Sequence, residues 1–350
     1  MKAALKTEDG RFSIEDVEKP EIPNPDWVLV RIRVTGICGT DLRHWKKAEP
    51  QLTHKIMGHE LAGEVVEVGS NVTKVKPGDR VVVETLLGDG TCEWCQVQQY
   101  NLCPNLYKVR METVSRSFAE FLMAPAEKLH LLPEHVSFEE AALLDTFSVS
   151  MHAIQLSGIK LNDVVAVIGA GPIGLGQLQL AKLSGAEVII VDMVDSSLAM
   201  AKELGADLVI NSKNDDPVKK VMEYTNGKGV DIAFECAGGQ SMPQTLPQAV
   251  ALTSIGGKVV IVGGFDEGEI AIPLEWQHIQ KSEINIIPSA SYSFWGIQSE
   301  MKMCLDLLAK GKLNAKKMIT HSFNLDEINK AFETAEDKEG SGAIFVALKV

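Results

Sequence analysis

A glycine-rich turn between an apolar run and a helix-like segment constrains the fold of this chain more than any other feature. The run Val164–Ile168 leads directly into Gly-Ala-Gly-Pro-Ile-Gly at positions 169–174. Such glycines allow a tight turn in which backbone N–H groups and a helix N-terminus face a pyrophosphate. Proline suits the first helical turn, where no N–H is needed. The pattern predicts a dinucleotide site whose residues are Gly169, Gly171, Pro172, Ile173 and Gly174.

An acidic residue, Asp192, closes the next apolar run at Glu187–Asp192. A carboxylate at this place accepts hydrogen bonds from a ribose diol and repels a 2′-phosphate. Residues 193–197 contain no Arg or Lys that would offset the repulsion. We therefore expect NAD rather than NADP. The alternative is a glycine turn in an α/β domain of another kind, with Asp192 a solvated strand end.

The pattern of expected secondary structure changes near residue 163. Between residues 27 and 84, short β-like runs alternate with turn signals, which predicts a compact, largely antiparallel β region. From 163 onward, strand-like and helix-like segments alternate, as in a doubly wound parallel sheet. Expected elements are strands at 164–168, 187–192, 207–210, 230–235 and 258–262, and helices at 172–184 and 298–310. The last run, 343–348, is too short to stand alone. We expect a β-rich domain of residues 1–150 and 296–350, and an α/β domain of residues 151–295.

The bulk composition excludes several partner classes. A chain of 350 residues is long enough for two domains, and 45% hydrophobic residues is typical of a globular protein. The net charge of -13 disfavours nucleic acid and anionic membrane surfaces, so a small molecule is the expected partner. The N-terminus does not resemble a secretion signal, and no apolar run reaches the length that spans a bilayer. The expected location is the cytoplasm.

Three of the six cysteines, Cys92, Cys95 and Cys103, lie within a dozen residues of one another, which in a cytosolic chain indicates a metal rather than disulfides. Cys38 and His59 are also possible zinc ligands, because thiolate and imidazole are ordinary ones. Taken alone, each of these two is more often a buried core residue.

Together these motifs resemble the zinc-containing medium-chain alcohol and polyol dehydrogenases, a family that includes sorbitol, butanediol and threonine dehydrogenases. The resemblance covers essentially the whole chain. Its carriers are G-I-C-G-T-D at 36–41, G-H-E at 58–60, the cysteine cluster at 92–103 and the glycine turn at 169–174. It implies a GroES-like catalytic domain, a Rossmann domain, NAD and a catalytic zinc ion.

The resemblance also implies residue roles near the zinc ion. Cys38 and His59 are its expected ligands, and Glu60 is a nearby carboxylate that exchanges with water on the metal. Asp41 is the expected hydrogen-bond acceptor that orients His59. Thr40 is expected to bind the substrate oxygen and to begin the proton relay.

The third protein ligand is expected just before the helix that follows residue 145, where Asp145 is the best-placed side chain. Polyol members usually carry Glu followed by Pro here, so Asp145 and Thr146 are departures from the family pattern. The alternative is that Asp145 only caps the helix. A second departure is Arg43, which stands where polyol members often have a relay histidine. The next residue, His44, either serves the proton relay or is solvated.

The cysteine cluster resembles the structural zinc lobe of the family, in which four cysteines bind the ion. Asp89 stands where the first cysteine is expected, so Asp89, Cys92, Cys95 and Cys103 form the expected second zinc site. The alternative is an empty site with three reduced thiols. Cys236 and Cys304 are expected in the core.

The resemblance implies an oxidoreductase that transfers a hydride between a secondary alcohol and NAD and forms the ketone. A polyol or diol is the favoured substrate, although Ser291 stands where sorbitol-type members tend to have Arg. A simpler secondary alcohol and a threonine-type amino alcohol remain alternatives. A non-catalytic NAD-binding protein is the alternative of another class, and the retained metal set disfavours both it and a zinc-free quinone reductase.

Trp45, Phe118, Tyr292 and Trp295 are either substrate walls or core residues. A homotetramer or homodimer is expected by resemblance, with 284–287 as the pairing edge.

Overall fold

The structure is a computed structural model that describes residues 1–106, 116–264 and 271–350. These residues fall into two compact units. The first contains Met1–Asp145, Gly296–Gly311 and Ala315–Val350, and the second contains Thr146–Trp295 and Lys312–Asn314. Within the described ranges, no helix is both long enough and apolar enough to cross a membrane.

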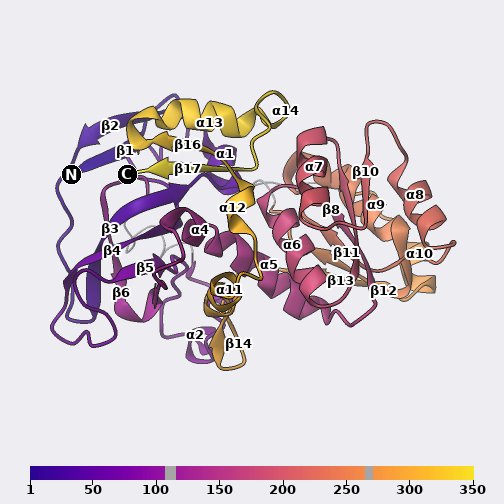
Figure 1. Ribbon diagram of the computed structural model, residues 1–350, viewed down its shortest axis with the longest axis horizontal. Coiled ribbons are helices and arrows are strands. Elements are labelled where there is room, and N and C mark those ends of the chain that lie inside the picture. The colour runs from indigo at the N-terminus through magenta and orange to yellow at the C-terminus, as the bar shows by residue number, and fades with distance from the viewer. Residues whose placement is uncertain (107–115, 265–270) are drawn as a thin grey trace. The chain divides into compact units, whose positions relative to one another are not determined.

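The first unit is built on a largely antiparallel sheet with the strand order β16-β17-β3-β4-β5-β7, in which β6 also pairs with β3. A separate hairpin, β1-β2, precedes it. The strands of this unit are β1 (Lys2–Lys6), β2 (Phe12–Asp16), β3 (Trp27–Gly36), β4 (Glu60–Val68), β5 (Arg80–Val83), β6 (Phe121–Pro125), β7 (Leu129–Leu131), β16 (Ile319–Asn324) and β17 (Phe345–Lys349). The C-terminal strand β17 therefore completes the sheet beside β3 (Figure 1).

Apolar side chains from neighbouring strands form the core of this sheet. Val30 and Ile32 of β3 pack with Leu61 and Val65 of β4, because residues two apart on a strand share one face. A second cluster contains three mutually packed phenylalanine rings, Phe12, Phe118 and Phe332. This cluster packs the N-terminal hairpin against α13 (Ile328–Glu336), one of the helices of this unit. These helices are α1 (Gly39–His44), α2 (Glu93–Gln96), α4 (Phe138–Ala142), α11 (Glu300–Ala309), α12 (Ala315–Met318), α13 (Ile328–Glu336) and α14 (Lys338–Ser341).

The second unit is a six-stranded parallel sheet in the order β10-β9-β8-β11-β12-β13. Its strands are β8 (Val164–Ile168), β9 (Glu187–Asp192), β10 (Leu208–Asn211), β11 (Val230–Glu235), β12 (Thr253–Ile261) and β13 (Asn285–Pro288). Figure 1 shows helices flanking these strands. They are α5 (Leu144–Ser157), which begins in the first unit, α6 (Pro172–Leu183), α7 (Asp195–Glu203), α8 (Pro217–Tyr224), α9 (Met242–Leu252) and α10 (Trp276–Lys281). A short hairpin follows β13, and its strand β14 (Phe294–Trp295) belongs to the second unit whereas its strand β15 (Gln298–Ser299) belongs to the first.

The strand order of the second unit is that of a doubly wound fold. The chain builds β8, β9 and β10 outward in one direction, then returns to place β11 on the other side of β8. Loops leave β8 and β11 in opposite directions at this point, so a crevice opens at the carboxyl ends of the two strands. The expected fold class, a β-rich domain and a doubly wound parallel sheet, is therefore confirmed.

Candidate functional site

The junction between β3 and α1 places Cys38 just beyond the end of β3, an interior strand of the first sheet. Cys38 is the residue that precedes α1, and its N–H donates to Asp41 Oδ2 over 3.1 Å. A carboxylate at this position satisfies a helix N–H that has no intrahelical acceptor. Asp41 is itself buried. The bond holds the thiol at the start of the helix.

His59 and Glu60 reach the same place from the adjacent strand. Glu60 begins β4 and lies directly opposite Gly36 of β3 in the ladder. Gly36 has no side chain, and a Cβ there would collide with Glu60 Oε2 and with the Phe345 ring. Gly58, just before His59, has φ +89°, a left-handed conformation that favours glycine. Both glycines therefore serve the placement of the two side chains that follow Gly58.

Cys38, His59 and Glu60 converge. One ligand atom from each lies within 4.8 Å of the other two, and His59 and Glu60 are buried. Sulfur, imidazole nitrogen and carboxylate oxygen are the donors that zinc takes in proteins, at about 2.0–2.3 Å, so groups spaced this way can share one ion. Asp41 Oδ1 lies 3.8 Å from His59 Nδ1.

The electrostatics of this group favour a cation. Burial, with added repulsion from the carboxylates of Glu60, Asp41 and Asp145, raises the pKa of the Cys38 thiol well above its ordinary value. A divalent cation reverses this effect, because it stabilises the thiolate directly. The chemistry and the spacing of the donor set therefore fit zinc.

Asp145 lies outside the group of three but close enough for its charge to act on the Cys38 thiol. It is buried and stands in the first turn of α5, which begins at Leu144. A capping residue precedes its helix, so this position does not match the simple cap that the sequence left open. Asp145 thus shares the surroundings of Cys38, whereas Glu60 is the carboxylate that the structure brings into the close group.

The side chains expected in the proton relay lie on α1. Thr40 Oγ1 is 3.8 Å from Cys38 Sγ and accepts a hydrogen bond from Arg43 over 3.1 Å. His44 Nδ1 lies 3.0 Å from Glu49, whose carboxylate also pairs with the buried Lys6 ammonium over 2.5 Å. His44 is therefore held by a carboxylate.

Sequence reasoning missed the pair behind His44. Lys6 Nζ also donates to the His44 carbonyl over 2.6 Å, at the end of α1, where a cation and a donor are both favourable. Neither Lys6 nor Glu49 belongs to a motif. The one available signal was a lysine directly after an apolar run, at the end of the strand Lys2–Lys6, where a buried charge needs a partner.

The cysteine loop gathers a second set of donors. Ligand atoms of Asp89, Cys92, Cys95 and Cys103 all lie within 4.8 Å of one another. Gly88 makes room for them, because a Cβ there would collide with Cys95 Sγ. Burial raises the pKa of the Cys95 thiol to about 12. The four groups can therefore enclose one cation, which would favour the thiolates.

Asp89 has a structural role as well. Its Oδ1 accepts the N–H groups of Thr91 (2.9 Å) and Cys92 (3.0 Å), and its Oδ2 accepts Asn105 Nδ2 over 2.7 Å. These hydrogen bonds, that of Asn105 first, hold the pKa of the Asp89 carboxyl well below its usual range. A carboxylate offers about four lone-pair sites, so these bonds leave room for a metal bond.

The glycine turn of the second unit has the geometry that the sequence predicted. Gly169 has φ +101°, and a Cβ at Gly174 would collide with the Gly169 carbonyl. Gly171 precedes α6 and Pro172 is its first residue. The Ile173 carbonyl, in the same turn, accepts a hydrogen bond from the Ser150 hydroxyl over 3.0 Å. The glycine turn therefore connects the carboxyl end of β8 to the N-terminus of α6.

Asp192 ends β9 beside this turn. Its Oδ2 accepts the Ala170 N–H over 2.6 Å, and its Oδ1 accepts the N–H groups of Met193 (2.7 Å) and Val194 (2.9 Å). The carboxylate thus reaches the glycine turn from the neighbouring strand. This is the place where a ribose diol is bound in such folds.

Of the aromatic residues considered as substrate walls, Trp45, Phe118 and Tyr292 are buried, and Trp45 and Phe118 pack against Phe332 in the core. Trp295 is exposed. The two packed rings are therefore core residues, which is the second of the two readings that the sequence allowed.

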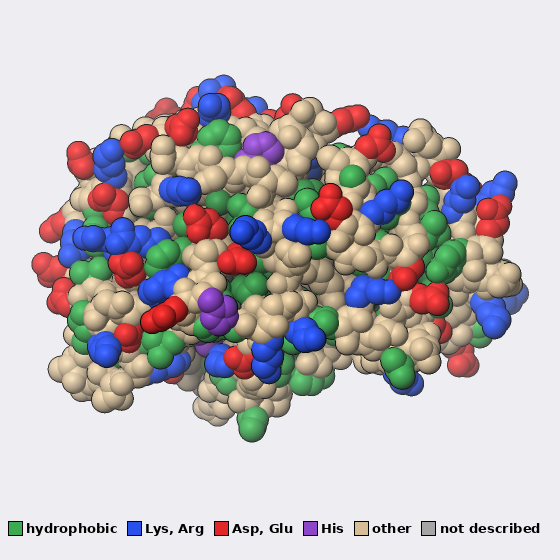
Figure 2. Space-filling view, in the orientation of Figure 1, with side chains coloured by type: hydrophobic (Ala, Val, Ile, Leu, Met, Phe, Trp, Pro, Cys, Tyr) green, Lys and Arg blue, Asp and Glu red, His purple; other side chains and the backbone are tan. Residues whose placement is uncertain are grey.

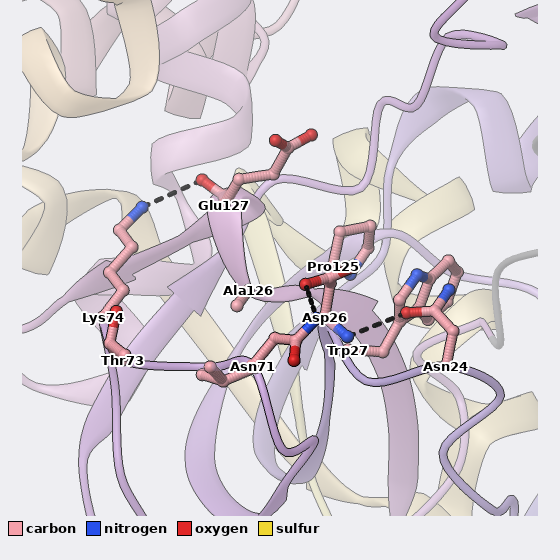
Figure 3. A pocket seen from close by; sticks show the side chains of 10 residues that line it. Asn24, Asp26, Trp27, Asn71, Thr73, Lys74, Pro125, Ala126 and Glu127 are labelled. Atoms are coloured by element: carbon pink, nitrogen blue, oxygen red, sulfur yellow. Dashed lines mark hydrogen bonds between the residues drawn. The ribbon is translucent and has the colours of Figure 1, made fainter.

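A separate pocket of about 510 Å³ lies at the far end of β3 from Cys38. Figure 3 shows its wall, where Asn71 donates to Asp26 over 3.1 Å and Lys74 donates to the Glu127 carbonyl over 2.9 Å. Most of its side chains are exposed, and it shares no residue with the metal or glycine-turn groups. Figure 2 shows acidic and basic side chains interspersed on the face in view, without a patch of one sign.

Comparisons with known proteins agree with this geometry. Residues 24–134 match the alcohol dehydrogenase GroES-like domain, and residues 172–310 match the zinc-binding dehydrogenase family. The chain is 35% identical to the sorbitol dehydrogenase of Bacillus subtilis (strain 168), over 96% of this chain and 93% of that one. It is 37% identical to the D-arabitol-phosphate dehydrogenase of Enterococcus avium, over 95% and 94% of the two chains.

A solved structure extends the comparison to the cofactor. A putative zinc-binding dehydrogenase from Sinorhizobium meliloti 1021, bound to NADP, superposes with a TM-score of 0.89 at 31% identity, over 100% of this chain and 99% of that one. Zinc and a nicotinamide cofactor are thus properties of the group that this chain matches. The chain belongs to the zinc-containing medium-chain alcohol and polyol dehydrogenases, which oxidise small-molecule alcohols.

Proposed function

We propose that Cys38, His59 and a carboxylate form the catalytic metal site, with Glu60 in the close group and Asp145 as the second available carboxylate. The single observation that carries this proposal is the convergence of Cys38, His59 and Glu60 within 4.8 Å. A catalytic zinc site needs about three protein ligands and one open position. Bound there, zinc supplies a Lewis acid that makes an alcohol hydroxyl acidic near neutral pH.

The surrounding side chains orient the ligands and the substrate. Asp41 both caps α1 at Cys38 and lies beside His59, so one buried carboxylate positions two ligands. Thr40 accepts from Arg43, which leaves its O–H free to point toward a substrate oxygen. Arg43 is a hydrogen-bond donor only, so the proton leaves Thr40 by another route. We place His44, held by Glu49, on that route.

We propose NAD as the cofactor, accepting the hydride from the alcohol carbon. Asp192 supports this choice, because its carboxylate reaches the glycine turn and would repel a 2′-phosphate there. Asp192→Asn removes the charge and keeps an acceptor. We expect the ratio of kcat/KM for NADP to that for NAD to rise about tenfold or more in this variant. An unchanged ratio would refute the assignment of Asp192.

We propose a polyol as the substrate, with a diol or simple secondary alcohol next and a threonine-type amino alcohol as the further alternative. Two relatives named for polyol or polyol-phosphate oxidation cover nearly all of the chain. The test is a screen of NAD-linked oxidation of sugar alcohols, their phosphates, diols and amino alcohols. If Cys38→Ser loses both turnover and zinc at the catalytic site, the activity seen in the screen arises from the proposed site of this protein.

A matched control for this test is Cys304→Ser, which changes a fully buried cysteine on α11 away from both donor groups. It should keep its zinc and its activity per folded molecule. Activity that survives in Cys38→Ser would contradict the proposed site, and preference for an amino alcohol would replace the polyol assignment.

We propose that Asp89, Cys92, Cys95 and Cys103 hold a second, structural zinc ion. The support is a closed group of four donors around one point, the pattern of structural rather than catalytic zinc. The same donors argue for a reducing compartment, and we therefore propose the cytoplasm as the location.

We also propose assembly of the chain into a dimer or tetramer through β13. This strand ends the parallel sheet and is partly exposed, so its free edge can pair with the same strand of a second copy. Light scattering after size-exclusion chromatography measures the assembly directly. A monomer at micromolar concentration would contradict it.

A further inference from the structure

The second wall of the crevice at the carboxyl end of the parallel sheet is formed by residues 235–239, which follow β11. The Cys236 N–H donates to the Ile168 carbonyl over 2.8 Å, so this turn is bonded to the end of β8. A Cβ on Gly169 would lie 2.8 Å from the Ala237 nitrogen. The glycine turn and the 236–239 turn therefore stand against each other at the point where the strand order reverses.

Glu235 holds this second wall from inside. Its side chain is fully buried, and its Oε1 accepts three hydrogen bonds, from the N–H of Ala237 (3.1 Å), the N–H of Gly238 (3.0 Å) and the Thr245 hydroxyl (2.7 Å). Thr245 belongs to α9. One oxygen thus connects the end of β11, the turn and the helix behind it.

The backbone of Glu235 extends the connection to the next strand. Its carbonyl accepts the N–H groups of Val262 (2.8 Å) and Gly263 (2.9 Å), which follow β12. Gly239 N–H donates to the Gly264 carbonyl over 2.8 Å. The loops after β11 and β12 are therefore locked together, with Glu235 at their centre.

The other carboxyl oxygen of Glu235 lowers the stability of the folded protein. Oε2 is buried and has no hydrogen-bond partner among the residues that the structure describes. A Cβ on Gly263 would lie 2.6 Å from it, so only glycine leaves room for the carboxyl group. An unpaired buried oxygen is destabilising, so folding stability alone does not explain a carboxylate at this position.

We propose that Glu235 is a positioning residue for the dinucleotide, which shapes the second wall of the crevice through the acceptor Oε1. The inference rests on the dinucleotide site proposed above. Backbone geometry within a few tenths of an ångström decides how closely a cofactor can lie on such a turn. The function of the side chain is therefore the placement of Ala237 and Gly238.

The test compares NADH dissociation constants of zinc-loaded Glu235→Ala and Glu235→Gln, measured by fluorescence titration. The alanine variant loses all three hydrogen bonds to Oε1, and its dissociation constant should rise about tenfold or more. The glutamine variant keeps an acceptor oxygen there and removes the unpaired one. It should bind within about threefold of the parent and unfold at the same or a higher temperature.

Threonine variants keep the test decisive if Glu235→Ala fails to fold. Thr245→Val removes one of the three donors and should weaken NADH binding severalfold. Its matched control is Thr253→Val, which removes a buried hydroxyl that donates to the Ala249 carbonyl over 2.7 Å at the opposite end of β12. The control should lose stability without a change in NADH binding.

The outcomes separate this inference from the proposed function. No NADH binding by the parent enzyme would refute the dinucleotide site itself. Parent-like NADH binding by folded Glu235→Ala, or by Thr245→Val where the alanine variant does not fold, would reduce Glu235 to a stability role and overturn the inference. An equal loss of NADH affinity in the glutamine and alanine variants would also overturn it, because the hydrogen-bond acceptor at Oε1 would then not be what supports NADH binding.

Discussion

Gly36→Ala should disable the enzyme by displacing a side chain rather than by removing one. Gly36 lies opposite Glu60 in the β3–β4 ladder, and a Cβ there would come closer than 3.0 Å to both Glu60 Oε2 and the Phe345 ring. Glu60 and Phe345 are almost fully buried, so a shift of either side chain disturbs the groups packed around it. The carboxylate has to move by several tenths of an ångström to about 1 Å.

The expected cost follows from that displacement. Overpacking of a core position costs about 1–3 kcal/mol of the free energy of unfolding. A shift of about 1 Å at a reacting centre costs about 100-fold in rate. We therefore expect kcat/KM for NAD-linked alcohol oxidation, corrected for folded and zinc-loaded enzyme, to fall about 100-fold. Zinc per chain is measured in the same samples by plasma mass spectrometry.

Gly63→Ala is the matched control. Gly63 lies on the same strand, β4, where a Cβ would collide with the Arg31 carbonyl and not with a donor group. It should lose stability, as Gly36→Ala does, but keep its activity per folded molecule. Parent-like kcat/KM in Gly36→Ala, or an equal loss in Gly63→Ala, would refute the link between Gly36 and the carboxylate.

Two further predictions concern the supports of the metal groups. Lys6→Met removes the ammonium that binds the His44 carbonyl and Glu49, and should lower the free energy of unfolding in urea by about 1.5–3 kcal/mol; an unchanged urea midpoint would contradict it. Gly88→Ala places a methyl group on Cys95 Sγ and should reduce bound zinc from about two ions per chain to about one, with the catalytic ion retained. Full retention of both ions would show that the loop does not need this space.

The architecture of the second unit was predictable in detail because its strands are buried on both faces. The segments Val164–Ile168, Glu187–Asp192 and Val230–Glu235 are mostly apolar and have clear ends, and they are the strands β8, β9 and β11. β12 was harder, since it begins at Thr253 rather than near 258. Its first residues include serine and two glycines, which indicate a turn, and its pairing with β11 is irregular there.

The donor groups of the site were predictable where they belong to compact motifs. Cys38 and His59 lie at the ends of two β runs, and the cysteine loop has short spacings, so local sequence was enough to nominate them. The choice between Glu60 and Asp145 was not predictable, because it depends on which carboxylate the fold brings closest to the Cys38 thiol. The carboxylate next to the Cys38 thiol is set by the Gly36–Glu60 register, which a one-residue slip would change.

The partners of single polar side chains were the least predictable feature. Nothing in the sequence connects Lys6 to Glu49, or the carboxyl group of Glu235 to Thr245. Each pair forms because distant segments bury the two groups together, and a buried polar group needs a partner. Such contacts are read from the fold, not from a local pattern.

The most direct test of the catalytic site is anomalous diffraction at the zinc absorption edge from crystals of the zinc-loaded protein. We predict a peak about 2.3 Å from Cys38 Sγ and about 2.0–2.1 Å from a ring nitrogen of His59, with a carboxylate oxygen of Glu60 or Asp145 completing the protein ligands. A fully loaded crystal with no peak between Cys38 and His59 would contradict the site and the mechanism built on it.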